Sequence, residues 1–158
     1  MPNWVTNDLI ITGNNADLQK FKKLAKEGKD VLSANKFIPY PKEYLAMDII
    51  AEEKNKLSDK KGNDYSNHIK DGYNSGGYDW CIQHWGTKWG FVDPQLKKQK
   101  NDELYYYFET AWSPPDPLIE KMSKMFPKLV FELKYGGEID EEGGYKLKNG
   151  KEIKKMRA

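Results

Sequence analysis

The sequence has only one cysteine, Cys81, and no apolar run that approaches the length of a membrane-spanning helix. One cysteine cannot form an internal disulfide, so we expect a reducing compartment. The N-terminus, Met1-Pro2-Asn3-Trp4, lacks the basic and apolar regions of a signal peptide. These absences predict a cytoplasmic protein that does not enter the membrane.

An excess of one charge is also missing. Lys and Arg number 26 against 24 Asp and Glu, which gives a net charge of +2. The two signs alternate along the chain, apart from an acidic stretch over 138–142 and a basic tail over 146–157. This balance neither requires a nucleic-acid partner nor suits an acidic mimic of DNA. Nearly all the basic charge is lysine, which favours a solvated surface over bidentate phosphate recognition.

Hydrophobic residues are scarce at 38%, and the mean hydropathy is −0.88. An aromatic content of 13% compensates, because each buried aromatic ring removes a large apolar area from water. Disordered chains are poor in aromatics. The composition therefore predicts one folded domain over residues 1–158 with a highly charged surface.

Apolar periodicity predicts the regular elements. Strands are expected over 4–12, 87–92, 104–111 and 129–135. Helices are expected between Asn15 and Gly28, over 42–61, from Asp79 to Trp85, and from Asp116 to Phe126. Asn15, Asp79 and Asp116 are the predicted N-caps of three of these helices.

The remaining segments are predicted as connections. Residues 62–77 are polar and glycine-rich and indicate an exposed loop, so the whole stretch of about 42–78 is interpreted as an insertion. Residues 97–102 are expected to form a charged turn. Asn149-Gly150 predicts a type I′ turn in a C-terminal hairpin over about 144–154.

This order of elements predicts the fold class. It is α+β, with a ferredoxin-like split βαβ antiparallel sheet that carries helices on one face and leaves the other free. The insertion, mainly helix and loop, and the C-terminal hairpin are additions to that pattern.

Residues 77–89 hold three of the five tryptophans, the only cysteine and one of the two histidines. Core packing is favoured over ligand stacking for these indoles, because large aromatics usually supply burial. The sequence does not separate core from surface among Trp80, Trp85, Trp89 and Trp112. A partly exposed pair beside the proline-rich corner 112–115 would be a natural anchor for a partner.

Cys81 and His84 lie three residues apart and share a helix face, so a nucleophile–base pair is conceivable. No orienting third group is evident, and single buried cysteines mostly act as small hydrophobes. Cys81, His84 and the distant His68 also lack the spacing of a zinc site. We therefore expect no enzyme activity, no catalytic residue, no metal and no cofactor.

A different class of function stays open as the alternative. Tyr105 and Tyr107 share one face of a predicted central strand, and RNA-recognition modules of this fold stack bases on such aromatics. The basic and glycine-containing strand pattern of those modules is missing here. A single-stranded nucleic-acid-binding module is thus the second hypothesis.

Four sequence blocks together carry a family resemblance. They occur in order between Met1 and about Tyr135: Met1–Trp4 with Asn7, Ile38–Pro41, Gly77–Trp89 and Thr110–Pro115. In these blocks the chain resembles the YubB-type ferredoxin-like family of phage and plasmid proteins of unknown function. It departs from that pattern in the polar stretch 52–76 and in its lysine-rich tail. The resemblance brings no catalytic residue with it.

The resemblance implies an accessory protein of a phage or another mobile element, working in the cytoplasm of a bacterial host. We expect it to bind a host or phage protein complex, as an inhibitor of a bacterial defence system of the anti-CRISPR type with a CRISPR effector as partner. The candidate partner-binding residues lie in the insertion and at the aromatic corner: Lys54, Lys56, Lys60, Lys61, Trp89 and Trp112.

Overall fold

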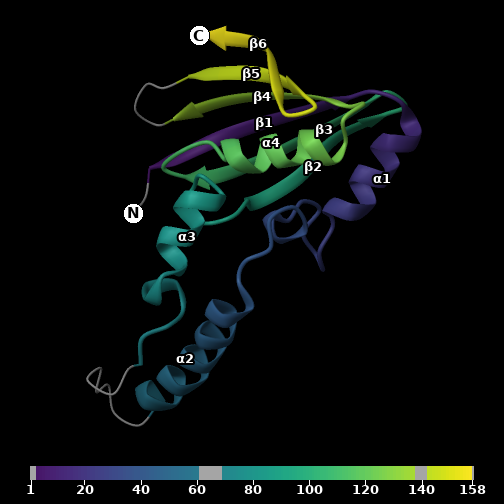
Figure 1. The fold of residues 1–158 in the computed structure, drawn as a ribbon. Helices are drawn as coiled ribbons and strands as arrows, with labels where there is room; N and C mark the ends of the chain where they lie inside the picture. Colours follow the sequence, from purple (N-terminus) through teal and green to yellow (C-terminus); the bar gives the residue numbers. More distant parts are fainter. Residues whose placement is uncertain (1–2, 61–68, 138–141, 158) are drawn as a thin grey trace.

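The computed structural model describes residues 3–60, 69–137 and 142–157. A six-stranded antiparallel sheet forms its centre, with the strand order β2-β3-β1-β4-β5-β6 (Figure 1). The strands are β1 (Trp4–Thr12), β2 (Val92–Lys100), β3 (Glu103–Ala111), β4 (Val130–Gly137), β5 (Gly143–Lys148) and β6 (Lys151–Arg157). The α+β ferredoxin-like prediction is confirmed, because β1 lies between β3 and β4 as in a split βαβ fold.

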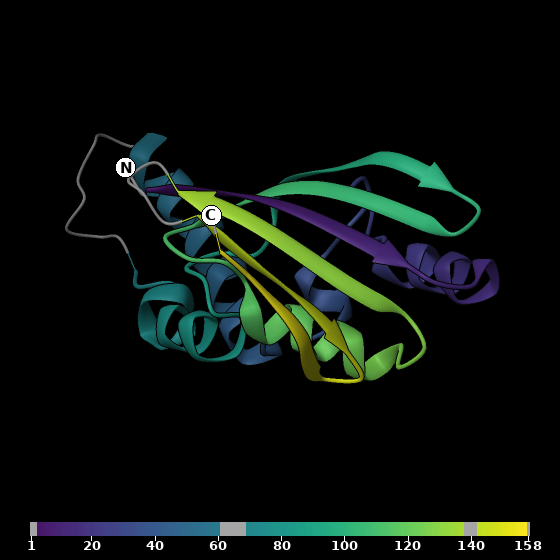
Figure 2. The same ribbon diagram turned by 90° about the horizontal axis from the view of Figure 1, so that it is seen from above.

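The helices form two groups. They are α1 (Asn15–Ala25), α2 (Lys42–Lys60), α3 (Gly77–His84) and α4 (Asp116–Met125), with short 3-10 turns at Ala34–Lys36 and Tyr73–Ser75. Figure 2 shows α4 on one side of the sheet, and α2 and α3 project away from the sheet in Figure 1. None of the described helices is long and apolar enough to cross a membrane.

The two central strands form because their side chains alternate. In β1 the residues Val5, Leu9 and Ile11 are buried, while their neighbours are exposed or half-buried. β3 alternates in the same way, with Tyr106 and Phe108 fully buried. An alternating strand has one face that must be covered, and α1 and α4 cover it.

Phe21 of α1 lies at the middle of the core. It is fully buried, and its ring lies 5.3 to 5.9 Å from four other aromatic rings. These rings belong to Phe37, Tyr106, Phe126 and Phe131, so one side chain joins α1 to β3, β4 and the end of α4. Such packing explains how a chain with few hydrophobic residues builds a core.

The prediction of a strand over 87–92 is wrong, as is the charged turn over 97–102. The strand β2 runs from Val92 to Lys100, and the turn is Asn101-Asp102. β2 is an edge strand with two register shifts, so it needs few apolar residues and tolerates exposed lysines such as Lys97, Lys98 and Lys100. An apolar pattern therefore does not reveal it.

The predicted N-caps of three helices are wrong, and α1 also ends earlier than expected. Asn14, not Asn15, caps α1, and its side-chain oxygen accepts the Asp17 N–H at 2.9 Å. This helix ends at Ala25, before Gly28. α3 begins at Gly77, so Asp79 lies in its first turn instead of capping it. Pro115 is the N-cap of α4, and the Asp116 carboxylate accepts the Tyr145 hydroxyl at 2.5 Å instead.

The C-terminal hairpin is confirmed with longer strands than expected. Asn149 and Gly150 have φ values of 51° and 76°, and they form a two-residue turn between β5 and β6. Two consecutive positive φ values are the requirement of a type I′ turn, which Asn-Gly meets at the lowest steric cost. β5 pairs with β4, so the hairpin extends the sheet at that edge.

Candidate interaction surfaces

A cluster of four aromatic side chains and one lysine lies at the end of the sheet next to α3. We call it the aromatic corner and define it by Trp4, Tyr78, Lys88, Trp89 and Trp112. Trp89 is 36% exposed and Trp112 is 46% exposed. Tryptophan is enriched in protein interfaces relative to the rest of the surface, so a cluster that exposes two indoles is a candidate interaction site.

Lys88 lies between the two exposed indoles. Its Nζ atom is 4.7 Å from the ring centroid of Trp89 and 4.7 Å from that of Trp112. Each ring face carries negative charge, so both indoles attract the ammonium group. Trp4 and Tyr78 contact the outer sides of this arrangement, each with a centroid distance of 5.9 Å to its neighbouring indole. The cation thus fixes the two tryptophans relative to each other.

Hydrogen bonds from side-chain hydroxyls to backbone carbonyls hold the aromatic corner in place. The Thr87 hydroxyl donates to the Ala111 carbonyl at 2.8 Å, and the Ser113 hydroxyl donates to the Gly86 carbonyl. Gly86 has φ +76°, and a Cβ there would lie 2.5 Å from a Pro117 ring carbon, so only glycine fits this turn. These contacts tie the segment before Lys88 to the segment around Trp112.

Trp112 has φ +74°, a left-handed conformation that a bulky side chain rarely adopts. Its N–H donates to the Asn3 carbonyl at 2.8 Å, which holds the backbone in that conformation. Such strain costs on the order of 1–3 kcal/mol and persists only where surrounding contacts impose it. The structure therefore holds an exposed indole in an unfavourable conformation.

The other two indoles of this region have a structural role. Trp85 is buried, and its Nε1–H donates to the Ile38 carbonyl at 2.8 Å. Trp80 is half-buried, stacked on His84 at 4.7 Å and edge-on to Trp85 at 5.2 Å. The four tryptophans thus divide into a packed pair, Trp80 and Trp85, and an exposed pair, Trp89 and Trp112.

Cys81 and His84 are not arranged as a nucleophile and base. Cys81 is buried, and this burial is the main cause that raises the pKa of its thiol to about 11. The nearby Asp48 carboxylate adds to the increase. The His84 Nδ1 atom is buried and has no hydrogen-bond partner among the described residues. His68 lies outside the described residues, and within them no group of three or more side chains could hold a metal ion.

We predict that the native Cys81 thiol reacts slowly with a disulfide reagent at pH 8. With a pKa of about 11, roughly one part in a thousand is thiolate at that pH, against about a tenth for an ordinary thiol of pKa 9.0. We expect a rate about 100-fold or more below that of the same protein in urea, measured by absorbance. Fast stoichiometric labelling of the folded protein would contradict this and would revive the cysteine-enzyme hypothesis.

The candidate lysines of the insertion lie on or beyond α2. Lys54 and Lys56 are exposed, and Lys56 forms an ion pair with Glu52 at 3.0 Å along the helix. Lys61 and the side chain of Lys60 lie outside the described residues. Lys54 and Lys56 belong to α2, whereas Trp89 precedes β2 and Trp112 follows β3 at the aromatic corner, so the described candidates come from different parts of the fold.

Tyr105 and Tyr107 lie on the sheet face opposite α1 and α4, which we call the open face. Both are half-buried. The Tyr105 hydroxyl donates to the Asp8 carboxylate, which raises the pKa of this tyrosine to about 12. Burial raises the pKa of the Tyr107 hydroxyl, and the carboxylate of the neighbouring Glu109 adds to this increase. The predicted stacking residues therefore share their surface with carboxylates, which repel phosphates, and with Lys97, whose Nζ atom lies 5.7 Å from the Tyr107 ring centroid.

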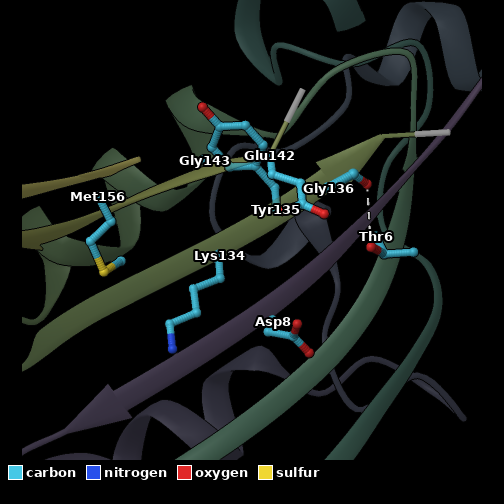
Figure 3. Close-up of a pocket in the computed structure, with 8 residues that line it drawn as sticks. All are labelled: Thr6, Asp8, Lys134, Tyr135, Gly136, Glu142, Gly143 and Met156. Atoms are coloured by element: carbon cyan, nitrogen blue, oxygen red, sulfur yellow. Dashed lines mark hydrogen bonds between the residues drawn. The ribbon is translucent and has the colours of Figure 1, made fainter. Parts of the chain in front are cut away.

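A hollow of about 540 Å³ lies on the open face, across β1, β4 and the start of β5. Figure 3 shows Asp8 and Lys134 on neighbouring strands, and the Thr6 hydroxyl donates to the Gly136 carbonyl at 3.3 Å. The hollow exists partly because Gly136 has no side chain. The Asp8 carboxylate in this hollow accepts a hydrogen bond from the Tyr105 hydroxyl, and Glu142 supplies a second carboxylate to the lining.

A second hollow, of about 380 Å³, lies between α1 and β2 and is rimmed by Lys22, Lys23 and Lys26. Tyr106 forms part of its floor, and the hydroxyl of this tyrosine has no hydrogen-bond partner among the described residues. That oxygen is itself enclosed by protein. A ligand could not reach it without a rearrangement of the floor.

Sequence reasoning missed Lys88, although it lies between two residues of the aromatic run. The spacing gives no signal for it, because Trp112 comes from another strand end and meets Lys88 only in the folded protein. Trp4 and Tyr78 were missed for the same reason. The adjacency of Lys88 and Trp89 alone could have suggested a lysine near an aromatic ring.

Residues 84–157 match the family model for the ferredoxin-like domain in Api92-like protein. The matched region contains β2 to β6 and α4, which supply most of the sheet. The ferredoxin-like domain of Api92-like proteins is therefore the part of the resemblance that the comparison supports.

A solved structure matches over the full chain. It is the crystal structure of a protein api92 from Yersinia pseudotuberculosis, with a TM-score of 0.64 and 10% sequence identity. The match covers 100% of this chain and 98% of the api92 chain. At this identity the likeness shows a shared fold, which includes the region of α2 and α3. No curated protein matches the sequence.

Proposed function

We propose that this protein is a non-enzymatic accessory protein that acts by binding another protein, with the aromatic corner as its anchor. The observation that carries the proposal is Lys88 held between the exposed rings of Trp89 and Trp112 on a hydrogen-bonded scaffold. Tryptophan is the residue most enriched among interface hot spots. Preorganised anchors lose little side-chain entropy on binding, so they support affinity efficiently.

The identity of the partner is a further proposal that rests on the resemblance to phage and plasmid proteins. We propose a mobile-element protein in the bacterial cytoplasm whose partner is a host defence complex such as a CRISPR effector. The exposed lysines of α2, Lys54 and Lys56, would add electrostatic attraction to such a nucleic-acid-containing complex. The buried Cys81 thiol supports a function without covalent chemistry.

The test is co-elution of the purified protein with purified CRISPR effector complexes of bacterial hosts on a size-exclusion column. We expect co-elution at physiological salt, and a weaker complex after Lys54→Glu. Lys20→Glu, an equal charge reversal on the exposed side of α1, should leave binding unchanged. The same samples are titrated with a single-stranded oligonucleotide as a comparison.

Two results would overturn the proposal. Failure to bind any effector complex removes the defence-complex partner. Salt-sensitive binding to the oligonucleotide that falls when Tyr105 and Tyr107 become alanine would instead favour the open face and the nucleic-acid hypothesis.

A further inference from the structure

The helix α2 packs against the protein mainly through polar contacts, around one buried alanine, Ala51. Asp48 accepts hydrogen bonds from the Tyr40 hydroxyl at 3.0 Å and from the Tyr73 N–H at 2.8 Å. Asn55 forms a reciprocal pair of hydrogen bonds with the backbone of Ile69. Gly72 lies directly against the Tyr44 backbone on the same side. These contacts attach α2 to the protein through polar groups.

The opposite side of α2 is apolar and exposed. Leu45, Ile49 and Ile50 are 48%, 49% and 47% exposed. With Ala46 they follow the i, i+1, i+4, i+5 spacing of one helix side, and Lys42 and Glu53 end this stripe. The 3-10 turn Tyr73–Ser75 contacts the inward side of α2 through the Tyr73 N–H, and none of the described residues covers the exposed stripe. An amphipathic helix with its apolar side exposed needs a partner.

We propose that this α2 stripe is a dimer interface, in which α2 of a second copy of the chain packs antiparallel against it. A two-fold axis at the level of Met47 and Asp48 places Lys42 opposite Glu53 of the second copy and Leu45 opposite Ile50. Ile49 then packs over the small Ala46 of the second copy, in the manner of knobs-into-holes packing. Each Lys42–Glu53 pair occurs twice by symmetry.

Charge selects this arrangement over the alternatives. A parallel pair would place Lys42 near Lys42 and Glu53 near Glu53. An antiparallel pair shifted so that Leu45 meets Leu57 would bury Glu53 against Ile49, which leaves a carboxylate in an apolar contact. Because α2 projects from the sheet, the antiparallel pair places the two sheets at opposite ends (Figure 1). The dimer does not involve the aromatic corner, but it shares α2 with Lys54 and Lys56 of the proposed function, so its test measures self-association alone.

Sedimentation velocity of the full chain across the micromolar range tests the proposal. We expect a concentration-dependent dimer, with a dissociation constant on the order of micromolar for so short a helix contact. Lys42→Glu alone and Glu53→Lys alone should each weaken it about tenfold or more, because each change opposes like charges at two symmetric positions. The double variant with both changes should restore the dimer.

We expect the variants to fold, because the side chains of Lys42 and Glu53 are both exposed. Circular dichroism checks the fold of each variant. Lys54→Glu is the matched control, because Lys54 lies on the same helix outside the stripe, and it should leave the dimer unchanged. A monomer at every concentration would assign the stripe to another partner and overturn the proposal. The proposal is also overturned if neither single charge reversal weakens the dimer, or if the double variant stays monomeric.

Discussion

Replacing Phe21 with alanine should lower the free energy of unfolding by about 3–5 kcal/mol, the range for a fully buried phenylalanine. Phe21 is 0% exposed and contacts four aromatic rings from different parts of the fold. Rings contributed by two strands, a helix end and a loop cannot all shift to fill the space. A cavity should therefore remain, and the cost should fall near the upper end of that range.

Urea denaturation followed by tryptophan fluorescence measures this effect. Phe91→Ala is the matched control, because Phe91 is half-buried and its main ring contact is Phe108 at 4.5 Å. We expect the control to cost about 1–2 kcal/mol, in proportion to the smaller area that it buries. If Phe21→Leu proves as costly as Phe21→Ala, the aromatic contacts rather than the cavity set the energy. Equal costs for Phe21→Ala and Phe91→Ala would contradict the central position of Phe21.

Replacing Trp112 with glycine should nearly abolish partner binding while leaving stability almost unchanged. Glycine accepts φ +74° without strain, which offsets the loss of the contacts with Lys88 and Tyr78. We expect the free energy of unfolding to change by less than about 1 kcal/mol. Loss of an indole anchor should weaken binding by about 30-fold or more.

The affinity is measured by calorimetry on the effector complex that co-elutes with the protein, and stability by thermal melting. Ile153→Ala provides the control, since Ile153 is 54% exposed on β6, away from the corner. It should change neither quantity appreciably. Full binding by Trp112→Gly would remove the aromatic corner from the interface. A large loss of stability would mean that Trp112 holds the fold together despite its exposure.

The sequence predicts the central strands well because burial imposes a period of two on them. Leu9 and Ile11 in β1, and Tyr106 and Phe108 in β3, must all face the helices, so the alternation is unbroken. The turn at Asn149-Gly150 is equally predictable, since few residue pairs accept two left-handed conformations. These elements are predictable because they depend on the pattern and the conformational preferences of neighbouring residues in the sequence.

Other parts depend on partners distant in sequence and escape prediction. From the sequence, Asn14 and Asn15 are equal candidates for the N-cap of α1. The structure separates them, because the Asn15 side chain donates to the Asn101 carbonyl at 3.1 Å instead of capping the helix. The side of α2 that packs inward is mainly polar apart from Ala51, and the large apolar side chains of this helix are exposed. The usual inference that large apolar residues mark the buried side of a helix therefore fails here. Lys88 acquires its second indole only when the end of β3 reaches it. The candidate site is thus less predictable than the sheet that supports it.

The lysines along both outer strands have a consequence for behaviour at high concentration. β2 carries Lys97, Lys98 and Lys100, and β6 carries Lys151, Lys154 and Lys155, all of them exposed. Repulsion between these lysine-rich edge strands opposes the edge-to-edge pairing of sheets into fibrils. The irregular hydrogen-bonding pattern of β2 opposes it as well. Both edges of the sheet are therefore poor templates for the strands of another copy.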